Sequence, residues 1–462
     1  MYKSKREPTI TIITTTPQER KNRKKRKNDK KRGFFFELIL IFLVIFSPVF
    51  HGSLTPAPLS VIQFASFALL LSWGVRLIRV SGSEVIYPSS TFFVVLFFSI
   101  LIFQLIPLPT VILKVISPST LALYKQYLPD FTKSGFYPLT IYSFATKREF
   151  LNSIPLFFIF FVTLNIIEKR GSFNRLFLTI IFWSLALSLY GVVKRYFLPI
   201  GEEPYSFSTF GNKNHFAAYM VMAAPLAMGY ALLQRERVKK YLFGFIAAII
   251  CASVFLSLSR AGALSIIFSL ILMFFLLKKE GTATGRRWLI SAAVLVAILV
   301  LFSGIGPIKE RFLKLQMAWL WRWNIVQDSM PLIKDFPLFG VGWGNFQYIF
   351  TLYKKFISVS YYAHLHNDHL QLIAETGLIA AFFYFAFLVG LFREIFANLK
   401  TRRDPFVKNM VIGGICGLLG MVFHSFFDFN FHIPAVAFLF WFILSLIYKC
   451  SYTHFRYEKE DH

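Results

Sequence analysis

Repeated apolar runs, each close to the length that crosses a bilayer, constrain this chain more than any other feature of its sequence. A helix of roughly 20 apolar residues covers the ~30 Å hydrocarbon layer of a membrane. The chain is 56% hydrophobic and only 16% charged, whereas soluble proteins carry about 25% charged residues. The runs are apolar on every side, while a soluble helix keeps one polar face. The sequence therefore predicts an all-α polytopic membrane protein.

About twelve such runs follow one another along the chain. We expect membrane spans at Phe34–Phe50, Leu59–Leu77, Thr91–Leu108, Leu151–Ile167, Leu176–Val193, His215–Leu233, Tyr241–Leu258, Ala261–Leu277, Trp288–Ser303, Leu370–Phe392, Val407–Phe427 and Pro434–Tyr448. The expected organisation is a disordered basic tail (1–33), the first nine spans (34–303), a large polar loop (304–369), the last three spans (370–448) and a second short tail (449–462).

The uneven spread of positive charge predicts how the chain is oriented. The formal net charge is +27, and much of it lies in residues 1–33. The remainder lies in every second short connection, for example at Arg76, Arg170 and Arg235, and basic loops of this kind stay in the cytoplasm. Both termini are therefore expected in the cytoplasm, with the large loop on the outer side. We expect the basic tail to contact anionic membrane lipids rather than nucleic acid.

The large loop carries structure of its own. Ile308–Met330 interleaves Trp and other apolar residues with Lys and Arg, which predicts an amphipathic helix at the level of the lipid headgroups. Pro331 and Pro337 are expected to bound that helix. The glycine-rich stretch Gly340-Val-Gly-Trp-Gly344 predicts a tight turn.

Basic residues at the outer ends of several spans are candidates for binding an anion. Arg260, in Ser257-Leu-Ser-Arg-Ala-Gly262, lies between two apolar runs, where an unpaired guanidinium costs several kcal/mol. It either snorkels from a helix end or clamps a phosphate with its fork of donors. Gly211-Asn-Lys-Asn-His-Phe216 opens a span, and its free amides with Lys213 would favour an anion, although Asn and Gly also simply cap helices. Arg195 lies across the same loop and would strengthen the positive field.

Three histidines, His364, His366 and His369, end the large loop and suggest two chemistries. His366 and His369 would share a helix face next to Asp368, which suits a metal. No fixed carboxylate partner and no Asp-x-Asp pair accompanies them, so we expect no metal. A neutral His366 would instead act as a general base toward an incoming hydroxyl, or it would only cap the following helix.

Further polar residues interrupt the last spans. Gln371 and Glu375 are four residues apart and would share one helix face, and His424 and Asp428 repeat this spacing on the next helix. Glu375 within an apolar span is expected to meet a cation or a polar cavity, or to lock two helices through a hydrogen bond.

Several of these residues together resemble the motifs of the O-antigen ligase family of membrane glycosyltransferases. His366-Asn367, nine intervening residues and Gly377-Leu-Ile resemble the family's histidine motif. Ser259-Arg260-Ala-Gly262 and Asn212-Lys-Asn-His-Phe216 are similar to its upstream signatures, and residues 322–346 to its approach to the motif. Ala380 departs from the motif, which has a second glycine at that position.

The resemblance implies a bacterial inner-membrane enzyme that transfers a glycan at the periplasmic face. The donor would be an undecaprenyl-diphosphate-linked glycan and the acceptor a lipid or surface glycan, with no nucleotide sugar, cofactor or obligatory metal. By carry-over, Arg260 would bind the diphosphate and His366 would activate the acceptor hydroxyl. The expected substrate-binding residues are Arg322, Lys213, Arg195, Asn367 and Glu375.

Two other functions are also compatible with the sequence. A polysaccharide polymerase of the same family would carry the same motifs and differ only in its acceptor. A lipid-linked glycan flippase or transporter would show two halves with similarly broken helices and charges near the middle of the membrane. The polar residues of this chain lie in the outer loops instead, which favours a transferase.

Overall fold

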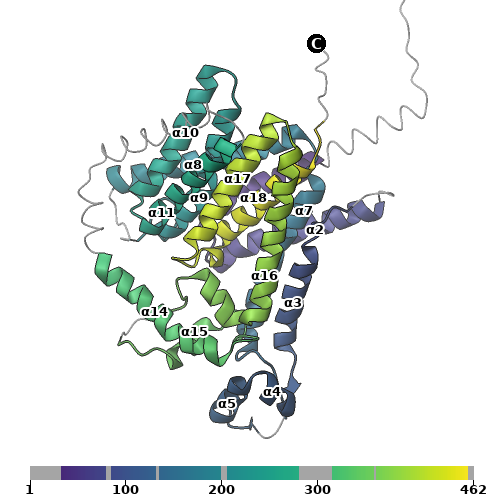
Figure 1. Ribbon diagram of the computed structural model, residues 1–462, viewed down its shortest axis with the longest axis vertical. Helices are drawn as coiled ribbons and strands as arrows, with labels where there is room; N and C mark the ends of the chain where they lie inside the picture. Colours follow the sequence, from purple (N-terminus) through teal and green to yellow (C-terminus); the bar gives the residue numbers. More distant parts are fainter. Residues whose placement is uncertain are drawn as a thin grey trace, which may run out of the picture.

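The computed structural model describes residues 33–79, 85–131, 135–198, 205–279, 315–357 and 361–455, and most of these residues are helical (Figure 1). The long helices are α2 (Pro56–Arg79), α3 (Thr91–Leu105), α7 (Ser143–Ile166), α8 (Arg170–Phe197), α9 (Lys213–Leu233), α10 (Arg237–Leu256), α11 (Arg260–Lys279), α14 (Leu315–Asp335), α16 (Asp368–Thr401), α17 (Pro405–His424) and α18 (Pro434–Tyr452). The short elements are the helices α4 (Thr110–Ile116), α5 (Pro118–Tyr127) and α15 (Phe346–Ile349), the 3-10 turns η1 (Phe350–Leu352) and η2 (Asn430–His432), and the antiparallel strands β1 (Leu108–Pro109) and β2 (Phe136–Tyr137).

Within the described residues, nine helices are long and apolar enough to cross a membrane, namely α2, α7, α8, α9, α10, α11, α16, α17 and α18. Two further expected spans are shorter apolar helices, Gly33–Phe46 and Thr91–Leu105. The first of these ends before Phe50, because residues 47–54 form turns. The expected span Trp288–Ser303 lies outside the described residues. The prediction of an all-α polytopic membrane protein is confirmed.

Helices α9, α17 and α18 form the centre of the bundle. Nearly every side chain of α9 and α18 is buried, because these helices are surrounded by others rather than by lipid. Small residues let α9 and α17 approach closely: a Cβ added at Gly413 or Gly417 would collide with the backbone of α9. Close contact of this kind, through glycine and alanine, is how helices associate where lipid removes the hydrophobic driving force.

Two small units lie beyond one end of the bundle (Figure 1). The first contains β1, α4, α5 and β2 around its own apolar cluster. The second contains α14, α15 and η1 around another cluster that includes Ile325, Phe336 and Phe346. A backbone hydrogen bond of 3.0 Å from Ile141 to Val341 joins the two units. None of the described helices in these two units is among the candidate membrane spans.

The amphipathic helix predicted at Ile308–Met330 corresponds to α14, with residues 308–314 outside the described residues. The prediction that Pro331 ends this helix is wrong. Pro331 lies inside α14, which continues to Asp335. A proline inside a helix removes one backbone hydrogen bond, and here the buried Leu332 and Phe336 anchor the last turn to the neighbouring cluster.

A glycine-rich turn fastens the second unit to α16. Gly340, Gly342 and Gly344 all have positive φ, as the sequence predicts for a tight turn. Gly377 also has a positive φ of 76° and marks a kink inside α16, where a Cβ would collide with the carbonyl group of Leu338. The turn and the kink are joined by a hydrogen bond of 2.9 Å from the Gly342 amide to the Glu375 carbonyl. Only glycine accepts both the positive φ and this close backbone contact.

Candidate functional site

The candidate site lies where helix ends of the bundle meet these two small units. His366 lies in the segment just before α16, Asp428 just after the end of α17, and Arg260 is the first residue of α11. Arg322 reaches the same place from α14. His366 has a φ of 58°, which is uncommon for a residue with a side chain and is found preferentially at functional positions.

His366 and Asp428 form a hydrogen-bonded pair. The Nδ1 atom of His366 lies 3.0 Å from Oδ1 of Asp428, which is fully buried. Burial opposes ionisation of Asp428, but the bond from His366 and the positive charge of Arg322 outweigh it and hold the pKa of the carboxyl well below its usual range. The His366 ring is partly exposed, and no described residue hydrogen-bonds its Nε2 atom. Because the carboxylate holds the proton on Nδ1, Nε2 is free to accept one.

Two arginines give this pair a positive surrounding. Arg322 donates to the Phe427 carbonyl at 2.9 Å, and its second terminal nitrogen lies 3.4 Å from Oδ2 of Asp428. Arg260 is close enough to Arg322 for the two charges to repel each other. The Nη1 atom of Arg260 is buried and has no hydrogen-bond partner among the described residues. An unsatisfied guanidinium nitrogen beside a second arginine is a site prepared for an anion.

Asn214, at the start of α9, links Asp428 to the two upstream motifs, Asn212–Phe216 and Ser259–Gly262. Its Nδ2 atom donates to Oδ2 of Asp428 at 2.5 Å, and its Oδ1 atom accepts from the Ser259 hydroxyl at 2.8 Å. Ser259 Oγ in turn accepts from the Gly262 amide. The two upstream signatures therefore position the carboxylate that holds His366.

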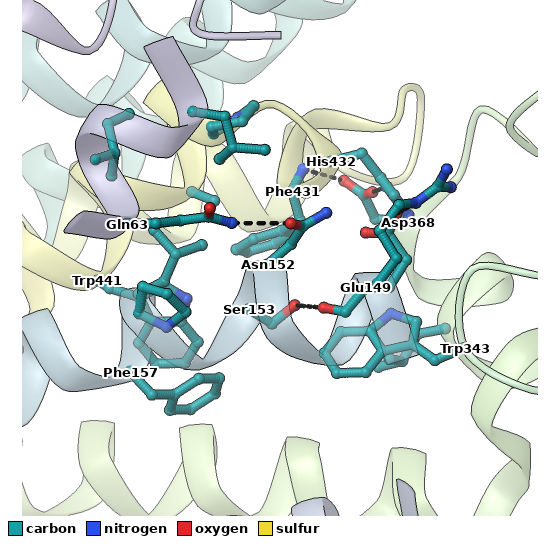
Figure 2. A pocket seen from close by; sticks show the side chains of 18 of the residues that line it. Gln63, Glu149, Asn152, Ser153, Phe157, Trp343, Asp368, Phe431, His432 and Trp441 are labelled. Atoms are coloured by element: carbon teal, nitrogen blue, oxygen red, sulfur yellow. Dashed lines mark hydrogen bonds and ion pairs between the residues drawn. The ribbon is translucent and has the colours of Figure 1, made fainter. Parts of the chain in front are cut away.

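A second carboxylate–histidine pair lies close by. His432 Nδ1 is 3.0 Å from Oδ1 of Asp368, whose Oδ2 accepts from the Phe431 amide (Figure 2). Burial opposes protonation of His432, but Asp368 outweighs it and raises the pKa of the imidazole to about 9. The adjacent His364 ring lies 4.5 Å from that of His432. Burial and the repulsion of His432 lower the pKa of His364 to about 2.

Gln371 and Glu375 share a face of α16, as predicted, and have structural contacts. Gln371 Nε2 lies 3.1 Å from Oε1 of Glu375 and 3.2 Å from Nε2 of His432. The Glu375 carboxylate also accepts from the amides of Gly344 and Phe346. Glu375 thus joins two elements through hydrogen bonds, and it also lines a polar cavity next to His432, so the structure agrees with both interpretations of Glu375.

Other predicted site residues are placed as follows. Asn367 caps α16, with its side chain accepting from the Leu370 amide at 3.1 Å. Lys213 is the first residue of α9, and its ammonium lies 6.0 Å above the Tyr205 ring. Arg195 lies in the last turn of α8. Among the described residues, no side-chain contact joins Lys213 or Asn367 to the His366–Asp428 pair, so the geometry favours His366, Arg260 and Arg322 among the predicted residues.

Two predictions about helix faces are wrong. His366 and His369 do not share a face, because α16 begins only at Asp368 and His369 binds the Val422 carbonyl at 3.0 Å. His424 and Asp428 do not lie on one helix either, since α17 ends at His424.

Within the part of the chain that the structure describes, no three His, Cys, Asp or Glu side chains are grouped as metal ligands.

Asp428 and Asn214 were not predicted as site residues. A carboxylate at the end of an apolar run was the available signal for Asp428, since such a group needs a cation or hydrogen-bond donors. Asn214 gave no signal of its own, because asparagine at a helix start is usually a cap, a role that Asn212 fills here.

The fold and the site together define a multi-pass membrane protein with a histidine–aspartate pair and two arginines at one end of its bundle. Residues 243–385 match the family model described as O-antigen ligase. The match includes Arg260, Arg322 and His366 and confirms the resemblance over these residues, whereas the Asn212–Phe216 signature lies outside the match. This family implies a glycosyltransferase-like membrane enzyme that acts on a lipid-linked glycan and an acceptor. No curated protein matches the chain.

Proposed function

We propose that this protein transfers a glycan from undecaprenyl diphosphate to a hydroxyl of a lipid or surface acceptor. The observation that carries the proposal is the His366–Asp428 pair, in which Nε2 of His366 has no partner among the described residues. Arg322 contacts Asp428, and Arg260 lies close to Arg322. This arrangement supplies the two things that such a transfer needs: a base for the hydroxyl and positive charge for the leaving diphosphate.

His366 acts as the general base. Its Nε2 accepts the proton of the acceptor hydroxyl as the oxygen attacks the anomeric carbon of the donor. Asp428, fully buried and bonded to Nδ1, fixes the tautomer and stabilises the imidazolium that forms. The protonated histidine then releases its proton to water before the next turnover. General-base catalysis of this kind typically contributes about 10²–10⁴-fold to a rate.

The arginines bind the leaving group. As the bond between the anomeric carbon and the phosphate oxygen breaks, negative charge develops on the diphosphate. Arg260 meets that charge with its buried, unpartnered Nη1, and Arg322 strengthens the local positive field while it also holds Asp428. Arginine suits this task because its planar fork matches phosphate oxygens.

The orientation follows from charge at the helix ends. The site lies at the starts of α9, α11 and α16, whereas the opposite ends carry basic residues such as Arg79 and Lys400 in the last turns of α2 and α16. Under the positive-inside rule, those ends lie in the cytoplasm and the site faces the periplasm of a bacterial inner membrane. This is the compartment in which a lipid-linked glycan is presented after it has crossed the membrane.

The test is glycan transfer in membranes of a strain that lacks its own enzyme of this kind. Wild-type protein is expected to restore transfer, and His366→Ala and Arg260→Ala are expected to abolish it while they insert at the wild-type level, as measured by immunoblot. One glycan added per acceptor identifies a ligase, whereas a ladder of increasing length identifies a polymerase. Full activity in both variants would contradict the proposal and favour a transporter.

A further inference from the structure

A cavity of 540 Å³ lies beside the second carboxylate–histidine pair (Figure 2). It lies among the starts of α2, α16 and α18 and the first half of α7. Its volume lies within the range of small-molecule sites, roughly 300–1,000 Å³. His364, Asp368 and His432 contribute to its wall, but His366, Arg260 and Arg322 do not. The mechanism above therefore leaves this cavity without a role.

The lining combines flat aromatic rings with uncharged hydrogen-bonding groups and with charged side chains that pair with one another, Arg148 with Glu149 and His432 with Asp368. Trp441 and Trp343 lie toward opposite sides of the view in Figure 2, with Asn152 of α7 between them. Gln63 donates to Asn152 Oδ1 at 2.9 Å. This single bond leaves the Gln63 carbonyl oxygen and the Asn152 amide NH₂ without a partner among the described residues, so an acceptor and a donor remain for a ligand.

A sugar ring presents the surface that matches this lining. Its C–H faces pack on aromatic rings, and its neighbouring hydroxyls both donate and accept hydrogen bonds. A hydrocarbon chain would instead leave the Gln63 carbonyl oxygen and the Asn152 amide NH₂ unsatisfied, and burying polar groups without partners is costly. A diphosphate would meet three carboxylates, those of Glu149, Asp368 and Glu375. The cations in the lining already pair with two of them, Arg148 with Glu149 and His432 with Asp368, so the lining offers a diphosphate no unpaired positive charge among the described residues. The lining therefore favours an uncharged sugar unit over both the polyprenyl chain and the diphosphate.

One aromatic ring separates the cavity from the proposed base. His364 lines the cavity and stacks on Phe429 with ring centroids 4.3 Å apart. The His366 ring packs against the same Phe429 at 4.9 Å. A glycan held in the cavity would thus extend toward His366 within the reach of a neighbouring sugar unit.

We infer that this cavity is a glycan-binding subsite that holds one sugar unit of a substrate while the reacting sugar or hydroxyl lies at His366. The inference rests on the proposed function for its substrate class and adds to it a second binding region, separate from the arginines. The sugar unit comes from either the donor glycan or the acceptor, since both present the same chemistry. Asn152, Gln63 and Trp343 are its recognition residues.

The test measures oligosaccharide binding directly, so that it does not depend on transfer. Purified full-length protein is titrated by saturation-transfer NMR with two probes from the same cells: the oligosaccharide released by mild acid from their lipid-linked glycans, and the oligosaccharide released from their surface glycolipids. Wild type is expected to bind one of them, and the one that binds identifies donor or acceptor. Asn152→Ala and Trp343→Ala are expected to weaken that binding about tenfold or more, a loss of about 1.4 kcal/mol.

Matched variants separate this inference from the proposed function. His366→Gln and Arg260→Ala are expected to leave oligosaccharide binding unchanged, while Arg260→Ala weakens binding of farnesyl diphosphate, a short soluble analogue of the lipid donor. Asn398→Ala and Trp73→Leu remove an amide and an indole far from the cavity and serve as controls. Thermal unfolding checks that each variant is folded, and the milder Trp343→Phe and Asn152→Asp replace any that is not.

The inference is overturned if neither oligosaccharide binds wild type, or if the cavity variants bind it as wild type does. It is also overturned if Trp343→Ala weakens binding of farnesyl diphosphate and not of sugar, since the cavity would then hold the lipid. Normal sugar binding without any transfer by wild type would instead contradict the proposed function and leave the subsite standing.

Discussion

The two carboxylate–histidine pairs of this protein have the same geometry and different surroundings. In both, an Nδ1 atom lies 3.0 Å from an aspartate oxygen, and in both the aspartate also accepts from a backbone amide. Arg322 accompanies the first pair, His366–Asp428. Glu375 and Glu149 lie near the second pair, His432–Asp368, and help to raise the pKa of its histidine to about 9.

The remaining nitrogen of each ring separates the two roles. Nε2 of His366 has no partner among the described residues, whereas Nε2 of His432 lies 3.2 Å from Gln371, which is itself fixed by Glu375 and by the Leu365 amide. A base needs a free nitrogen that a substrate can reach. The pairing alone therefore does not distinguish the proposed base from a structural histidine. The free nitrogen and the sign of the surrounding charge are what favour His366 as the base.

Replacing each histidine with glutamine is expected to give the largest difference in glycan transfer between the two pairs. His366→Gln keeps a group that can bond Asp428 but removes the base, so glycan transfer should fall roughly 10²–10⁴-fold with little change in thermal unfolding. His432→Gln should lower the melting temperature and reduce transfer per folded molecule far less. Both are measured as initial rates normalised to folded protein. Equal losses of transfer in the two variants would remove the distinction between the pairs.

Replacing Arg322 is expected to have the next largest effect, because among the described residues no arginine contacts the second pair. Arg322→Ala removes positive charge beside Asp428 and beside the expected diphosphate, and transfer should fall about 10²-fold, as for other lost charge-stabilising donors. Arg322→Lys restores charge without the planar fork and should recover part of the loss. Lys114→Ala, an exposed lysine of α4, serves as the control for non-specific charge effects. A rate equal to wild type in Arg322→Ala would remove Arg322 from the mechanism.

Replacing the two aspartates is expected to distinguish the pairs through a smaller effect on glycan transfer. Asp428→Asn keeps the shape but offers an amide to Nδ1, which favours the wrong tautomer of His366, and transfer should fall about 10–100-fold, the usual range for a residue that orients a functional histidine. Asp368→Asn should act mainly on thermal unfolding, because it breaks a buried pair. Rates and melting temperatures measured on the same preparations compare the two. If Asp368→Asn lost more transfer than Asp428→Asn at equal folding, the assignment would be reversed.

The helices were predictable and their contacts at the site were not. Apolar runs fixed the spans because each helix must satisfy its own backbone within lipid, and Arg260, Arg322 and His366 stood out as polar residues among them. Asp428 contacts His366 only in the folded chain, because the two residues lie 62 positions apart in the sequence. The kink at Gly377 likewise depends on the backbone of Leu338. Contacts between distant segments leave no periodic pattern that a single sequence can show.

A sequence pattern also led to a wrong prediction where the same spacing fits two different local structures. Four-residue spacing placed Gln371 and Glu375 on one face correctly, but the same spacing failed for His424 and Asp428, because α17 ends between them. Helix ends are the least certain part of such predictions. Asn367 shows a related ambiguity: as the cap of α16, it has a structural reason to be asparagine that needs no substrate.

The pH dependence of stability is expected to give the smallest effect. It tests whether the charge of His432 stabilises the fold. Asp368, Glu375 and Glu149 raise the pKa of His432 from 6.5 to about 9, so its protonated form stabilises the fold fully below pH 6.5, and this contribution is lost as the pH rises through 9. Between pH 6.5 and 8 the loss should be roughly 1–2 kcal/mol, seen as a lower melting temperature.

His364 acts in the opposite sense. Its pKa is lowered to about 2, so its neutral form stabilises the fold above pH 6.5, and that contribution decreases as the pH falls below it. Melting temperature should therefore be highest near pH 6.5. His432→Gln should flatten the alkaline side of this profile, while His366→Gln should leave that side unchanged. An alkaline decline that persists in His432→Gln would show that the charge of the second pair does not support the fold, and the contrast between the two pairs would then rest on the free nitrogen of His366 alone.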